Sequence, residues 1–307
     1  MSHSVIEHVS DTAFLVAQCR AAESERADSL FSDPWASVLA GDKGKALAEA
    51  SPRAAMTLWV IAIRTVVIDG LLQDALADGV DTILNLGAGL DARPFRMKLP
   101  RELTWIDVDY PDVVAFTAER LASARAQCTH EQVGLDLADL QARRALLTKV
   151  GAQAKRLLVL TEGLVPYLDL EAAANLADDL RAIPTLQSWI VDYNSPESHR
   201  YRRRAGVTRQ LRNAPLKFQP SDYFAFFAEH GWKAGEVRYL PPEGIRLGRP
   251  APLPRLIRAL TPLLERVLPA EKRFSRSVGY VRFVPSAGSS ASRRRGVWPG
   301  HAGLGLL

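Results

Sequence analysis

The fold class follows from one short stretch, Asp81-Thr82-Ile83-Leu84-Asn85-Leu86-Gly87-Ala88-Gly89. Its apolar run has the length of a strand and leads directly into a glycine turn, which is typical of a buried strand in a parallel sheet. A long segment before it, roughly residues 54–77, has apolar residues at helical spacing. The stretch therefore predicts a first strand that follows a helix and ends in a tight turn.

Further strands follow at regular intervals, with helical patterns between them. The apolar runs occupy residues 103–109, 132–137, 156–163 and 188–193, and the helical patterns occupy residues 111–126 and 170–183. Residues 236–240 and 278–284 are candidates for two last strands, and residues 12–50 are expected to be helical. Strands that alternate with helices of this length predict a doubly wound α/β fold, with a mostly parallel sheet and N-terminal helices.

We expect one domain over residues 1–285 and a disordered, low-complexity tail over residues 286–307. Residues 197–217 interrupt the alternation after the fifth strand and are predicted to form an inserted lid. Seven basic residues occur there with no acid among them: Arg200, Arg202, Arg203, Arg204, Arg209, Arg212 and Lys217. Such a cluster could select an anionic acceptor or be a solvated surface.

The composition excludes several classes of protein. Charged residues make up 24% of the 307 residues and hydrophobic residues 47%, which is typical of a globular chain. We find no secretory signal, no apolar run of about 18 residues and only two cysteines, so we expect a cytoplasmic protein without a membrane partner. The histidines show no ligand spacing, and we expect no metal.

Acidic residues follow every predicted strand of the parallel sheet. They are Asp91, Asp107 and Asp109, Asp136, Glu162, and Asp192 beside Tyr193. Ligands of open α/β sheets bind beyond the carboxyl ends of the strands, so these acids are expected at one site. A ligand with hydroxyl groups, an amine and a cationic end would suit them.

Four motifs carry a resemblance to a known family. They are Thr12-Ala13 through Asp33-Pro34, Asn85 through Arg93, Asp107-Val108-Asp109-Tyr110-Pro111, and Thr161 through Leu168. Their order and spacing resemble the leucine carboxyl methyltransferase family over about residues 10–240, and look most like its bacterial branch, which includes polyketide O-methyltransferases. The resemblance implies a Rossmann-like class I methyltransferase fold and an S-adenosyl-L-methionine (S-adenosylmethionine) cofactor.

The resemblance also implies which residues bind that cofactor: Arg20, Arg64, Gly87, Gly89, Asp109, Asp136, Leu137 and Glu162. Arg64 is expected to pair with the cofactor carboxylate and Asp109 to bind the ribose. Asp136 and Leu137 are expected to bind the adenine. Glu162 is expected near the amino acid end of the cofactor.

An NAD(P)-dependent oxidoreductase is the main alternative, because residues 87–92 also fit the glycine pattern of dinucleotide-binding proteins. Asp91 would repel a pyrophosphate, and Pro94 removes a donor and biases Arg93 away from helix. S-adenosylmethionine has no phosphate. A nucleic-acid partner is not expected, because only Tyr201 lies among the arginines as a stacking aromatic.

The acceptor is expected to be a small molecule, polyketide-like and anionic, methylated on a carboxylate or hydroxyl oxygen. A carboxylate is ionised at neutral pH and needs no base, whereas a phenol would need one. The candidates for a catalytic base are Glu162, Tyr193 and His199.

Overall fold

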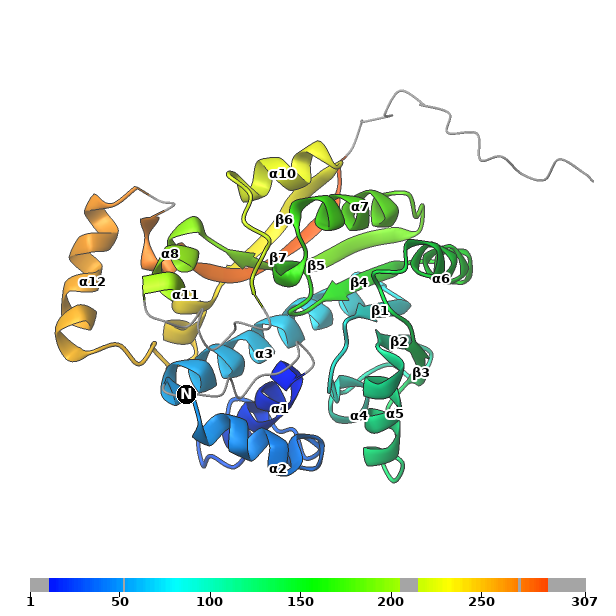
Figure 1. The fold of residues 1–307 in the computed structure, drawn as a ribbon, viewed down its shortest axis with the longest axis horizontal. Coiled ribbons are helices and arrows are strands. Elements are labelled where there is room, and N and C mark those ends of the chain that lie inside the picture. Colours follow the sequence, from blue (N-terminus) through cyan, green and yellow to red (C-terminus); the bar gives the residue numbers. More distant parts are fainter. Residues whose placement is uncertain (1–10, 52, 205–214, 270–271, 287–307) are drawn as a thin grey trace, which may run out of the picture.

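The computed structural model describes residues 11–51, 53–204, 215–269 and 272–286. Its centre is a seven-stranded sheet with the order β3-β2-β1-β4-β5-β7-β6, which confirms the doubly wound α/β prediction (Figure 1). The strands run over β1 Thr82–Leu86, β2 Thr104–Asp109, β3 Thr129–Gly134, β4 Leu157–Thr161, β5 Leu186–Asn194, β6 Trp232–Tyr239 and β7 Val278–Pro285.

The first five strands are parallel and β7 is antiparallel to both of its neighbours. Strand β3 begins three residues earlier than predicted, at Thr129, and it ends at Gly134 opposite Asp109. It is an edge strand without a continuous apolar run, so periodicity placed it poorly. As a consequence, Asp136 and Leu137 lie in the loop after β3.

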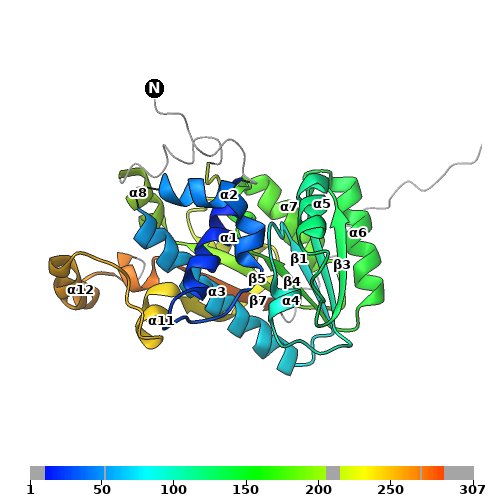
Figure 2. The same cartoon turned by 90° about the horizontal axis from the view of Figure 1, so that it is seen from below.

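Helices cover both faces of the sheet. Helices α6 (Leu140–Gln153), α7 (Leu170–Arg181) and α10 (Tyr223–Glu229) pack on one face. Helix α3 (Ala54–Ala77) packs on the other face, next to α11 (Leu240–Arg246). Helix α5 (Pro111–Arg120) contacts β3 and β2, and the short α4 (Arg93–Arg96) and η1 (Val165–Tyr167) follow β1 and β4. In the turned view, α3 crosses beneath the sheet (Figure 2).

Helix α3 is long and apolar enough, by length and composition alone, to cross a membrane, although Arg64 and Asp69 interrupt its apolar residues. Its side chains Ile63, Val67, Ile68, Leu71 and Leu72 are buried against the sheet. The helix is therefore a core element of this domain.

The N-terminal segment forms two helices, α1 (Asp11–Ser24) and α2 (Ala36–Glu49), which pack on each other. Asp33 accepts a hydrogen bond from the Trp35 N–H at 3.2 Å, just before α2 begins at Ala36. The carboxylate of Asp33 also pairs with Arg20 Nε at 2.8 Å. This ion pair fixes the connection between α1 and α2.

After β5 comes α8 (Pro196–Arg204), which contains the first part of the predicted lid. Residues 205–214 and the predicted tail from residue 287 onward lie outside the described residues. The chain then continues through α10, β6 and α11 to α12 (Arg255–Val267), η3 (Phe274–Arg276) and β7.

Candidate active site

The described residues enclose a cavity of about 560 Å³ at the carboxyl ends of β1, β2, β4 and β5. Helices α1 and α3, the η1 turn, and β7 close the cavity from the other sides. Its volume lies within the range of small-molecule sites. The site is therefore where an open α/β sheet is expected to bind a ligand.

The glycine turn forms the floor of the cavity. Gly87 (φ 72°) and Gly89 (φ 57°) have positive φ angles, which favour glycine. A Cβ atom on Gly87 would lie 3.3 Å from Leu164 Cβ, and a Cβ atom on Gly89 would lie 3.3 Å from Ala13 Cβ. The backbone of this turn is thus exposed to the cavity without a side chain, and it packs closely against η1 and α1.

Asp109 lies at the end of β2, beside the turn. One carboxylate oxygen accepts a hydrogen bond from the Gly89 N–H at 2.7 Å, and the other accepts from the Tyr110 N–H at 2.7 Å. Burial raises the pKa of Asp109, and the two N–H donors oppose that rise. Each carboxylate oxygen can accept a further bond, so Asp109 can receive hydroxyl groups of a ligand.

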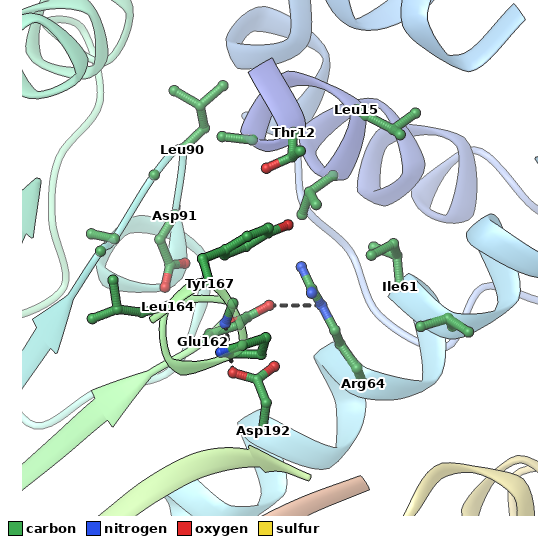
Figure 3. A pocket seen from close by; sticks show the side chains of 18 of the residues that line it. Thr12, Leu15, Ile61, Arg64, Leu90, Asp91, Glu162, Leu164, Tyr167 and Asp192 are labelled. Atoms are coloured by element: carbon green, nitrogen blue, oxygen red, sulfur yellow. Dashed lines mark hydrogen bonds and ion pairs between the residues drawn. The ribbon is translucent and has the colours of Figure 1, made fainter. Parts of the chain in front are cut away.

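Arg64 reaches across from α3 to Glu162, as Figure 3 shows, with Arg64 Nε 2.9 Å from Glu162 Oε1. Glu162 also pairs with Arg93 at 2.8 Å. Burial acts to lower the pKa of Arg64, but Glu162 and neighbouring groups together raise it above its usual range. Burial likewise acts to raise the pKa of Glu162, but Arg93 and Arg64 hold it below its usual range. Both side chains therefore stay charged at neutral pH.

Arg64 is not fully satisfied by this pair. Its buried Nε–H makes no well-directed hydrogen bond within the described part of the chain. A guanidinium group has five N–H donors, and a carboxylate ligand in the cavity could accept from those that Glu162 leaves.

A network of alternating charges extends from Arg93 and Asp91 in the cavity wall to Asp69 and Arg96. Arg93 pairs with Asp91 at 2.6 Å and with Asp69 at 2.7 Å, and Arg96 also pairs with Asp69 at 2.7 Å. Burial acts to raise the pKa of Asp91, but Arg93 and other arginines hold it below its usual range. The argument that Asp91 repels phosphate was therefore wrong, because Arg93 balances its charge.

The argument from Pro94 needs one correction as well. Arg93 is the first residue of α4, although it precedes a proline. Proline at the second position of a helix removes no bonded N–H, and this explains why Arg93 can be helical there. Helix α4 has only four residues, so a pyrophosphate would meet a short helix with one donor missing.

The second acid of β2 has a different environment. Asp107 accepts hydrogen bonds from Asn85 Nδ2 at 2.9 Å and Trp105 Nε1 at 2.8 Å. Its other oxygen lies 2.7 Å from His130 Nε2. Asp107 does not line the cavity and instead joins β1, β2 and β3.

The other predicted site residues divide into two groups. Arg20 and Tyr193 line the cavity, but Arg20 is occupied by Asp33 and by the Leu90 carbonyl oxygen, at 2.6 Å. Asp136, Leu137 and His199 do not line it. Asp136 is exposed and accepts from the Ala138 N–H at 2.9 Å.

Asp192 was expected at the site as an acid after the fifth strand, whereas Tyr167 and Tyr280 of the wall were not named as site residues from the sequence. Asp192 accepts a hydrogen bond from the Tyr280 hydroxyl at 2.7 Å and from the Gly163 N–H at 2.8 Å. Burial raises the pKa of Asp192. Tyr167 extends from η1 into the cavity (Figure 3). The position of Asp192 near the end of β5 is the signal that predicted it.

The wall away from the glycine turn is largely apolar. Helix α1 contributes Leu15 and Val16, α3 contributes Val60 and Ile61, and α11 contributes Leu240. The arginines that line the described cavity are Arg20, Arg64 and Arg93, and all of them pair with carboxylates. The described wall therefore suits a ligand with an apolar body.

The strand order with an antiparallel β7, the bare glycine turn on β1 and the acids at the strand ends define a class I methyltransferase fold. Two solved structures share it. A DUF574 family protein of Streptomyces avermitilis has a TM-score of 0.53 at 13% identity, covering 89% of this chain and 97% of its own. A Thermobifida fusca protein described as a "putative methyltransferase" has a TM-score of 0.52 at 14% identity, covering 88% of this chain and 94% of its own.

The chain belongs to the leucine carboxyl methyltransferase family, whose sequence profile matches residues 13–181. A Mycobacterium avium protein, described as a "putative S-adenosyl-L-methionine-dependent methyltransferase", is 31% identical over 279 residues, covering 82% of this chain and 88% of its own. A Frankia alni protein of the same description is 30% identical over 263 residues, covering 79% and 90%.

Proposed function

We propose that this chain transfers the methyl group of S-adenosylmethionine to a hydroxyl oxygen of a small, largely apolar acceptor. The observation that supports this most is the cavity itself, which combines a bare glycine turn, a carboxylate at the rim and an apolar wall. Both relatives described above are named for dependence on S-adenosyl-L-methionine.

The residues of the cavity fit this cofactor. Gly87 and Gly89 would let the backbone approach it, Asp109 would accept from the ribose hydroxyls, and Arg64 would donate to its carboxylate. Glu162 holds Arg64 in place by their ion pair. Asp136 and Leu137 stay predictions for binding the adenine; they do not line the cavity, whereas Tyr110 does.

Bound S-adenosylmethionine supplies an activated methyl group, so the protein's task is to orient the acceptor and exclude water. Leu15, Val60 and Ile61 would hold the apolar body of the acceptor. Tyr193 would donate a hydrogen bond, because burial raises the pKa of its hydroxyl to about 12 and keeps it protonated at neutral pH. Glu162 is a poor proton acceptor, because Arg93 and Arg64 lower its pKa.

Asp192 is the described carboxylate best suited to accept the proton of a hydroxyl acceptor. It lines the cavity, and burial raises its pKa, which makes it a stronger base than an ordinary aspartate. The described wall gives an anionic acceptor little support, because its arginines are paired. This is why we favour a hydroxyl over a carboxylate.

Asp192→Asn is expected to have opposite effects on activity and on stability. Loss of a general base should lower the methylation rate at least about 100-fold. Because burial disfavours the ionised form, Asp192 destabilises the fold once it loses its proton. Its full contribution to the free energy of unfolding is therefore present below the unfolded pKa of about 3.9, and it is lost as pH rises through the higher folded pKa. The variant should therefore gain stability over the native chain with rising pH, as thermal melts at pH 4 and pH 8 would show. Equal rates in the two proteins would contradict the assignment of Asp192.

Ligand-induced thermal stabilisation tests the cofactor directly. S-adenosylmethionine and its demethylated product should each raise the melting temperature, since a ligand at 100 times its dissociation constant adds about 2.7 kcal/mol. NAD(P) should leave it unchanged, because the four-residue α4 makes a poor pyrophosphate site. A shift with NAD(P) alone would instead favour the oxidoreductase.

A further inference from the structure

Helix α12 (Arg255–Val267) turns an apolar face to the solvent. Six side chains on it are between 46% and 72% exposed: Leu256, Ile257, Leu260, Leu263, Leu264 and Val267. At 100° per residue they fall within an arc of roughly 120° along one side of the helix. No residue of the described chain covers this side.

Two residues on the polar side of α12 face the protein. Thr261 and Glu265 are less exposed than the apolar residues, and Glu265 accepts hydrogen bonds from the Ser275 N–H, at 2.9 Å, and from the Ser275 hydroxyl. The usual arrangement of a surface helix, with its apolar side toward the core, is thus reversed. Reversed amphipathicity points to an apolar partner outside the domain.

The helix is held at both ends. Before it, the Trp59 indole donates to the Arg249 carbonyl oxygen at 2.7 Å, and Leu253 packs against the α3 side of the core. After it, Phe274 of η3 packs against the same core. Both views show α12 standing at the edge of the molecule, beyond α11 and α8 (Figures 1 and 2). The fold therefore presents this helix in a fixed position.

The charges on α12 indicate what kind of partner covers its apolar face. Arg255 and Arg266 lie along the same edge of the apolar face, near opposite ends of the helix, and Arg258 lies behind it. The sole acid of the helix, Glu265, is engaged by Ser275. We propose that α12 docks on a lipid surface with anionic headgroups, with its leucines inserted and its arginines at headgroup level.

A second copy of the chain fits this face less well. A stable protein interface takes about 20–30 residues a side, whereas α12 offers six apolar side chains. In a symmetric pair, the arginines of one copy would meet those of the other, with no free acid on either helix to pair with them. The sequence predicted no membrane partner because it considered only segments that would span a membrane, and docking of one helix on the surface differs from that expectation. The proposal does not depend on the proposed function.

Co-sedimentation of the full chain with vesicles tests the proposal. The native chain should bind vesicles that contain phosphatidylglycerol and bind neutral phosphatidylcholine vesicles more weakly, with binding to the former decreasing as salt increases. Leu260→Asp combined with Leu263→Asp should reduce binding at least about tenfold. Leu260→Ala combined with Leu263→Ala should also weaken vesicle binding, and this variant adds no negative charge.

Leu140→Asp with Leu170→Asp is the matched control. These leucines are 41% and 46% exposed at the starts of α6 and α7, and the control makes the same change in charge. Its binding should remain native, and thermal melts should show that all variants fold. Failure of the native chain to bind, or equal loss in the control, would overturn the proposal. So would sedimentation velocity that shows a dimer lost in the α12 variants without any vesicle binding.

Discussion

Asp109→Ala is expected to raise the dissociation constant of S-adenosylmethionine at least about tenfold. A carboxylate that accepts from two ribose hydroxyls makes charge-assisted hydrogen bonds of roughly 1.5–3 kcal/mol each. The substitution also leaves the Gly89 and Tyr110 N–H groups without their 2.7 Å acceptors, so the glycine turn loses its support. Isothermal titration calorimetry would measure both the affinity and the enthalpy.

Asp112→Ala is the control for that experiment, because Asp112 is exposed on the first turn of α5, three residues from Asp109. It removes the same charge from the same neighbourhood and should leave cofactor affinity within about twofold of native, since an exposed charge is well screened. Unchanged affinity in a folded Asp109→Ala protein would mean that this carboxylate does not bind the ribose.

Arg64→Met is expected to reduce methyl transfer at least about 100-fold, mainly through weaker cofactor binding. Methionine keeps the length and apolar packing of the side chain but removes the donors facing Glu162 and the cavity. Leaving a buried charge without its partner costs roughly 3–5 kcal/mol of unfolding free energy. The loss in Arg64→Met should be smaller, because Glu162 still pairs with Arg93 at 2.8 Å. Steady-state kinetics and thermal melts together separate the two effects.

A double-mutant cycle with Glu162→Gln sharpens this test. If Glu162 acts by positioning Arg64, then the double variant should be little worse than Arg64→Met alone, because the two losses share one cause. Full additivity of the two losses in affinity would show that Arg64 and Glu162 act independently. Rescue of Glu162→Gln by Arg64→Lys would contradict the need for a guanidinium group.

The parallel half of the fold could be predicted from the sequence because its central strands are buried on both sides. Strands β1 and β4 are fully buried, and their apolar runs mark them directly. Strand β3 is half exposed at the edge of the sheet, and its prediction was displaced accordingly. Asp136 and Leu137 do follow the carboxyl end of β3, but they do not line the cavity.

The candidate site was predictable where residues follow parallel strands in sequence. Asp109 and Glu162 were found in that way and line the cavity. Tyr280 was not, because β7 is antiparallel and its contact with Asp192 joins residues 88 positions apart. The pairing of Arg93 with Asp69 depends on tertiary placement, whereas its pairing with Asp91, two residues away, is local and was overlooked in the sequence.

The place of β7 in the sheet has a consequence for biosynthesis. This strand lies between β5 and β6, yet it is made after both. About 90 residues separate the end of β5 from the end of β7, which at a ribosomal rate of about 5–20 residues per second corresponds to roughly 5–20 s. During that interval β5 has an unpaired edge, which is a template for association with other nascent chains. The glycine turn, Asp109 and Glu162 are already synthesised by then, whereas the wall that includes Val278 and Tyr280 is added last.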